Sequence, residues 1–147
     1  MTFQGQSAFE SVLAPALVLV IWSLFIWVWM YATRLPAIGK AGLKPQDARF
    51  PGSLDVLPDG ARQVANNYNH LMEQPTIFYA LAVITYLVGQ QSPFTAMLAW
   101  TYVGLRILHS LIQNTVNLVP LRFLVFSLST ITLMVWAGSV AMAAFAG

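Results

Sequence analysis

Polar side chains recur at helical spacing inside segments that are otherwise apolar. Two sets step by four, three and four residues, which places each set on one face of a helix. The first stripe is Arg62, Asn66, Asn69 and Glu73, and the second is Tyr102, Arg106, His109 and Gln113. These residue types offer charge and hydrogen bonds, so they predict a polar layer where two helices meet.

Arg122, at the start of the last apolar segment, extends this layer to a third helix. Glu73 lies about 16 Å along its helix from Arg62, at 1.5 Å per residue. A charge in the middle of a membrane costs at least about 2.5 kcal/mol. A whole layer of polar residues is more costly than one structural pair would require. We therefore expect this layer to be a functional site.

Structural alternatives stay open for the same residues. Glu73 and Arg106 could form a buried ion pair that only holds the helices together. We expect His70 and His109 to be hydrogen-bonded packing residues. A metal site made of both imidazoles and Glu73 is the weaker alternative, because no tight ligand motif surrounds them, so no metal is predicted.

The composition indicates a membrane protein with a single domain, residues 1–147. Of 147 residues, 58% are apolar and 8% charged, and the mean hydropathy is +0.67. A soluble domain has about 25% charged residues, so membrane lipid is the expected surrounding. The net charge of +2 comes from scarce acids, which gives no support for nucleic-acid binding. Because the chain has no cysteine, any sulfur chemistry must be supplied by a substrate.

The apolar segments predict an all-α integral membrane protein, a four-helix transmembrane bundle. The segment Thr76–Gly89 is too short to cross a membrane, so its helix is expected to begin earlier and to include the first polar stripe. Pro75 then predicts a kink beside Glu73. Prolines in the first connection are expected to break any helix there. The expected spans are residues 12–33, 61–89, 94–114 and 120–145, and the expected loop is residues 34–60.

Basic residues predict the orientation of these spans. Six of the seven Lys and Arg lie in or beside the loop at 34–60 or the connection at 114–120. The positive-inside rule makes both connections cytoplasmic and places both termini on the opposite face. A cleaved signal peptide is the alternative for the first segment. No Lys or Arg precedes Arg34, however, so the basic leading region of such a peptide is missing.

Three stretches of the chain resemble the MAPEG family, membrane-associated proteins in eicosanoid and glutathione metabolism. They are the run from Arg62 to Pro75, the pair Arg106-x-x-His109, and the run from Val119 to Phe126. The stretch 44–48 is also similar to the first loop of prostaglandin E synthase. The resemblance covers nearly the whole chain and fits a bacterial branch of the family. It implies a homotrimer in the bacterial inner membrane with periplasmic termini.

The resemblance also implies roles for individual residues. Arg122 matches the arginine that lowers the pKa of the glutathione thiol and holds the thiolate, and it is the expected catalytic residue. Asn69 and Glu73 match residues that bind the glycyl and amino ends of glutathione. Gln113 and Phe126 stand where the synthases carry tyrosines, and the Asn-to-Glu spacing is four rather than three. The other expected contact positions are Arg34, Arg62, Arg106 and His109.

Two functions follow from this resemblance. The first is a glutathione-dependent transferase or peroxidase, in which glutathione is the co-substrate and a lipophilic small molecule is the electrophile. The second is a non-catalytic membrane scaffold of the same family that binds lipid or a partner. In both cases the expected partners are membrane lipid and further copies of the chain.

Overall fold

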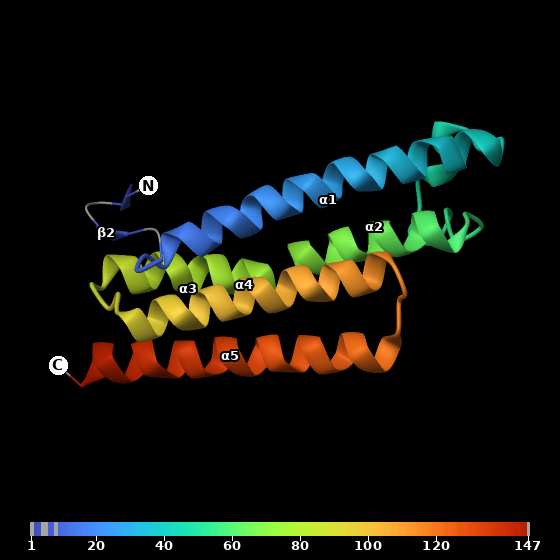
Figure 1. Ribbon diagram of the computed structural model, residues 1–147. Helices are drawn as coiled ribbons and strands as arrows, with labels where there is room; N and C mark the ends of the chain where they lie inside the picture. The colour runs from blue at the N-terminus through green and yellow to red at the C-terminus, as the bar shows by residue number, and fades with distance from the viewer. Residues whose placement is uncertain (1, 4–5, 8, 147) are drawn as a thin grey trace.

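The computed structural model describes residues 2–3, 6–7 and 9–146 and is helical over most of that length. Figure 1 shows the helices side by side, with both termini at one end of the bundle and the two basic connections at the other. We call the second end the loop end. A short antiparallel hairpin, Thr2–Phe3 (β1) with Gln6–Ser7 (β2), precedes the helices. The helices are α1 (Leu13–Lys40), the 3-10 helix η1 (Pro45–Ala48), α2 (Asp59–Met72), α3 (Pro75–Leu87), α4 (Pro93–Asn114) and α5 (Val119–Phe145).

The first helix is longer than expected. It passes through Pro36 and ends at Lys40, so the prediction that the prolines of the first connection break every helix is wrong at this position. A single proline removes one backbone hydrogen bond, and the packing of α1 against α2 supports the turns around it. With 28 residues, α1 is about 42 Å long and exceeds a hydrocarbon core of about 30 Å. Because the charged residues of α1, Arg34 and Lys40, both lie in its C-terminal turns, we expect the excess length at the loop end.

The second expected span is broken into two helices. The predicted kink beside Glu73 is confirmed, and it is a complete interruption, because Glu73 has φ −89° and ψ −97° and α3 begins at Pro75. Pro75 has no N–H to donate to the preceding turn. The end of α2 at Met72 also leaves the carbonyl oxygen of His70 without a helical partner, and Nη2 of Arg106 donates to it at 2.9 Å.

Aromatic packing ties the three helices after this break together. The ring of Phe78 in α3 stacks on Tyr102 of α4, with centroids 4.6 Å apart and planes 11° apart. The Phe78 ring also packs edge to face with Trp136 of α5, with ring centroids 5.7 Å apart. All three side chains are fully buried. Such large, well-oriented rings supply much of the packing between these helices.

Buried hydrogen bonds add direct links between helices. Oγ of Ser110 in α4 donates to Oδ1 of Asn67 in α2 at 3.0 Å, and neither residue is exposed. The amide of Gln74, inside the helix break, donates to Oγ1 of Thr130 in α5 at 2.8 Å. These bonds fix α2 and the break relative to the rest of the bundle.

Two helices, α1 and α5, are long and apolar enough on their own to cross a membrane. The other two expected spans carry the polar residues. Arg106 and His109 lie within α4, and the second span is divided between the amphipathic α2 and the apolar α3. The polar residues of the bundle are therefore concentrated at the loop end.

Replacing Phe78 by Ala should lower the free energy of unfolding by roughly 3 kcal/mol, because it removes a fully buried ring and leaves a cavity. The neighbouring Ile77 is 59% exposed, so Ile77→Ala should change it by less than about 1 kcal/mol. Unfolding by sodium dodecyl sulfate, followed by circular dichroism in mixed micelles, measures both variants. Equal losses would contradict the assigned core.

Candidate functional site

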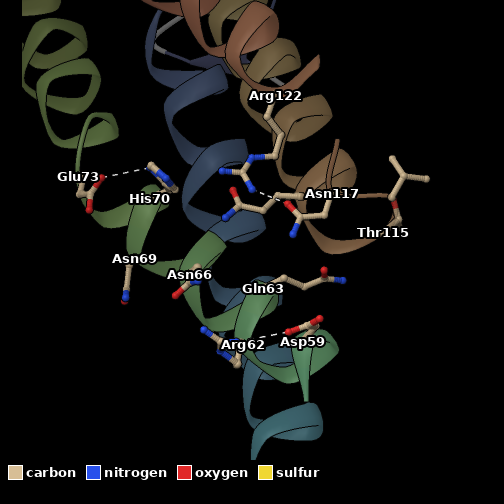
Figure 2. Close-up of a pocket in the computed structure, with 12 residues that line it drawn as sticks. Asp59, Arg62, Gln63, Asn66, Asn69, His70, Glu73, Thr115, Asn117 and Arg122 are labelled. Atoms are coloured by element: carbon tan, nitrogen blue, oxygen red, sulfur yellow. Dashed lines mark hydrogen bonds and ion pairs between the residues drawn. The ribbon is translucent and has the colours of Figure 1, made fainter. Parts of the chain in front are cut away.

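The first polar stripe lines a hollow of about 590 Å³ at the loop end, which we call the polar hollow. All four residues of this stripe line it, three from α2 and Glu73 from the break after it, and Figure 2 shows them opposite Asn117 and Arg122, which come from the α4–α5 connection and α5. Gln113 is the one member of the second stripe that reaches it. Its lining consists of Asp59, Arg62, Gln63, Asn66, Asn69, His70, Glu73, Gln113, Thr115, Val116, Asn117 and Arg122.

Arg122 is positioned by the turn before α5. One of its guanidinium nitrogens, Nη1, donates to Oδ1 of Asn117. Asn117 has φ 49°, in the left-handed region that asparagine tolerates better than most residues. Asn117 is not among the site residues that the sequence predicts. An asparagine shortly before a proline-led helix is the signal that could have identified it as a turn residue.

Two residues that line the polar hollow also hold unpartnered polar atoms. Oε1 of Gln113 and Nε of Arg122 are buried and have no hydrogen-bond partner in the part of the chain that the structure describes. Gln113 itself is 2% exposed. Buried polar atoms are normally paired with protein, water or ligand. Gln113 and Arg122 therefore keep unused hydrogen-bonding capacity beside the hollow.

Arg106 does not line the polar hollow. It is buried and donates to the carbonyl of His70, while its Nη1 lies 3.5 Å from Oε1 of Gln74. The Phe126 ring lies under its guanidinium, with 5.4 Å from Cζ to the ring centroid. Arg106 thus supports the backbone behind the hollow.

The proposed buried ion pair between Glu73 and Arg106 is wrong. The side chain of Glu73 is 66% exposed, and its Oε2 lies 3.2 Å from Nδ1 of His70. The helix break explains the difference, because Glu73 leaves the helical path and turns outward. His70 and His109 pack edge to face with ring centroids 5.8 Å apart. Among the described residues, no group of three His, Cys, Asp or Glu is arranged to hold a metal ion.

Arg34 lies in a separate hollow of about 340 Å³, between α1, the first connection and α2. We call this the second hollow. It shares Arg62, Asn66 and Asn69 with the polar hollow, so these three side chains stand between the two. Arg34 and Arg122 therefore lie on opposite sides of the row formed by these three α2 side chains.

A groove of about 190 Å³ adjoins the polar hollow, and we call it the apolar groove. Arg122 and His70 line both spaces. His109 and Phe126 form the inner wall of the groove, and the exposed Val119 and Phe123 form its outer side. Arg122 thus stands between a polar space and an apolar one.

The fold and site define a helical membrane protein with a hollow lined by polar and charged residues at one end of its bundle. The model of the MAPEG family matches residues 12–142, and the chain belongs to this family. It is accordingly an integral membrane protein. No curated protein and no solved structure matches the chain.

Replacing Arg106 by Met should lower the free energy of unfolding by about 2 kcal/mol, because the carbonyl of His70 loses its buried donor. Glu73→Gln should change it by less than about 0.5 kcal/mol, since Glu73 is exposed and its only described partner is His70. Detergent unfolding followed by circular dichroism compares the two. A larger loss for Glu73→Gln would restore the ion-pair hypothesis.

Proposed function

We propose that this protein is a glutathione-dependent transferase or peroxidase that acts on lipophilic electrophiles. One observation carries the proposal: the guanidinium of Arg122 lines both the polar hollow and the apolar groove. A reaction between a water-soluble thiol and a membrane-soluble partner needs such a junction. Family membership supports glutathione as the thiol.

The chemistry of the polar hollow suits a zwitterionic tripeptide. Glutathione carries two carboxylates, an ammonium group, two amides and a thiol. Arg62 pairs with Asp55 at 3.8 Å and with Asp59 at 3.4 Å, and these pairs are exposed, so a carboxylate of the ligand would replace them. The exposed Glu73 would meet the ammonium. The side-chain amides of Asn69 and Gln113, which both line the hollow, match the peptide amides. Each end of the tripeptide has a complementary group in the same hollow.

The reaction would begin with the thiolate of glutathione. A permanently charged guanidinium at Arg122 favours the thiolate and so lowers the pKa of the thiol, whose proton passes to water. The thiolate then attacks an electrophilic carbon in the apolar groove and forms a carbon–sulfur bond as the leaving group departs. With a lipid hydroperoxide the attacked atom is oxygen, and a second glutathione completes reduction to the alcohol, glutathione disulfide and water.

A non-catalytic scaffold that binds lipid or a partner remains the second candidate. It is favoured by Gln113 and Phe126, which replace the tyrosines of the synthases that the sequence resembles. Phe126 places a ring without a hydroxyl beside Arg106, so it offers no proton to a reacting group. Glutathione binding without turnover would select this function.

Arg122→Ala should abolish conjugation of glutathione to chlorodinitrobenzene and remove the ultraviolet absorbance of bound thiolate at neutral pH. Arg122→Lys should retain part of both signals, because the charge remains. Lys44→Ala, which removes a positive charge from the exposed first connection and lines neither hollow, serves as the matched control. Full activity of Arg122→Ala would exclude the role given to this arginine.

We further propose that the protein assembles as a homotrimer. Asn66 and Asn69 are exposed on α2, between the polar hollow and the second hollow. Amide side chains facing lipid would be costly, and hydrogen bonds between helices satisfy them. An interface along α2 would bring the Arg34 side of one subunit to the polar hollow of the next. The positive-inside rule places this loop end in the cytoplasm.

Native mass spectrometry in mild neutral detergent should show three copies of the chain. Asn66→Leu combined with Asn69→Leu should shift the population toward monomer, because each interhelical amide bond contributes about 0.6 kcal/mol. The doubly substituted Leu24→Ala and Val28→Ala protein, changed on the exposed face of α1, is the control. A monomer that binds glutathione with unchanged affinity would overturn the assembly.

A further inference from the structure

His70 lies at the same junction as Arg122. Among the described residues, these are the two that line both the polar hollow and the apolar groove. The side chain of His70 is 37% exposed. Figure 2 shows its Nδ1 turned toward Glu73 and the guanidinium of Arg122 beyond the opposite side of the ring. An imidazole in this place can exchange a proton with a group that Arg122 holds.

Charged and aromatic groups hold His70 in one orientation. Nη2 of Arg106 donates to its carbonyl oxygen at 2.9 Å, which fixes the backbone. Oε2 of Glu73 lies 3.2 Å from Nδ1, which restrains the ring. The rings of His109 and Phe126 pack against the imidazole, with centroids 5.8 Å and 6.4 Å from its own. A side chain that is restrained in this way is prepared for proton transfer, which requires a fixed geometry.

Glu73 determines which nitrogen of the ring is free. A carboxylate beside Nδ1 keeps the proton of a neutral imidazole on that nitrogen, so Nε2 presents a lone pair. Within the described part of the chain Nε2 makes no hydrogen bond, and it is not one of the buried polar atoms. A carboxylate, an imidazole and an open nitrogen in this order are the groups with which enzymes activate a hydroxyl or a thiol.

His109, the other histidine of the layer, does not lie in this position. It is 3% exposed, and it lines the apolar groove but not the polar hollow. A thiol held in the polar hollow therefore meets His70 and not His109.

We propose that His70 is the general base that accepts the proton of the glutathione thiol, and that Glu73 is the residue that positions it. This inference rests on the proposed function. The thiol gives its proton to Nε2, and the electron pair of the S–H bond stays on sulfur as the thiolate beside Arg122. His70 then passes the proton to water in the polar hollow.

An epoxide in the apolar groove uses the same proton in a second way. The thiolate forms a carbon–sulfur bond while the carbon–oxygen bond of the ring opens, and the oxygen keeps the electron pair of that bond. Nε2 of His70 returns the proton to this oxygen, which becomes a hydroxyl, and the imidazole is neutral again. The product contains all atoms of glutathione and of the epoxide, so no further reactant is needed.

The rate at which bound thiolate forms measures the base directly. Glutathione is mixed rapidly with the full chain in mild neutral detergent, and the ultraviolet absorbance of the thiolate is followed before any electrophile is added. His70→Gln has no basic nitrogen and should form the thiolate roughly a hundredfold more slowly. Its final absorbance should remain, because Arg122 still stabilises the thiolate. Lys44→Ala, on the exposed first connection, is the control with an unchanged rate.

Two further measurements separate proton transfer from a structural role. Added imidazole should restore part of the rate of His70→Ala, whereas pyrazole, a ring of the same size that is far less basic, should not. Glu73→Gln should slow thiolate formation at least about tenfold at saturating glutathione, because its amide can donate to Nδ1 and leave the proton on Nε2. In the unmodified protein added imidazole should have no effect, since His70 already supplies the base.

Four results would overturn the inference. An unchanged rate in His70→Gln would leave His70 as a residue that only ends α2, in whose last turn it lies. Equal rescue by imidazole and pyrazole would mean that the ring only fills space. A rate in the unmodified protein that rises in proportion to added imidazole would mean that no internal base exists, and this measurement needs no folded variant. Glutathione binding without any thiolate in the unmodified protein would instead reject the proposed function, and this inference with it.

Discussion

The guanidinium of Arg106 holds the polar end of this bundle in place. It lies inside a membrane protein without a carboxylate partner among the described residues, and it is satisfied instead by the backbone of a broken helix. The dependence is mutual, because the carbonyl of His70 needs a donor once the helix stops. A buried arginine and an interrupted span therefore stabilise each other, and each would be costly alone.

This arrangement determines what the site can offer. Since the break turns Glu73 outward, the carboxylate stays exposed and available to a ligand, and it does not neutralise Arg106. Arg106 in turn orients the Phe126 ring, which forms the inner wall of the apolar groove together with His109. The buried charge of Arg106 and the exposed charge of Glu73 are thus separated within the same layer.

Helical spacing was enough to predict the faces of the helices, because period and hydropathy act locally. The stripe from Arg62 to Glu73 lines one hollow, as its spacing predicts, and the kink follows from the chemistry of Pro75. Partners within the polar layer could not be predicted in this way. Spacing gives no information on whether Arg106 meets a carboxylate or a carbonyl, since that depends on how far the helix opens at Glu73. The turn at Asn117 and the overhang of α1 also depend on tertiary packing.

The interruption at Glu73 and Gln74 has a consequence for how the protein can vary. In a continuous helix each residue advances the direction of the side chains by a fixed angle, so one inserted residue would rotate everything beyond it. Here α2 and α3 are separate helices with independent rotational phase. The apolar segment can therefore be lengthened or shortened to match a thicker or thinner bilayer, while the side chains that face the polar hollow keep their direction.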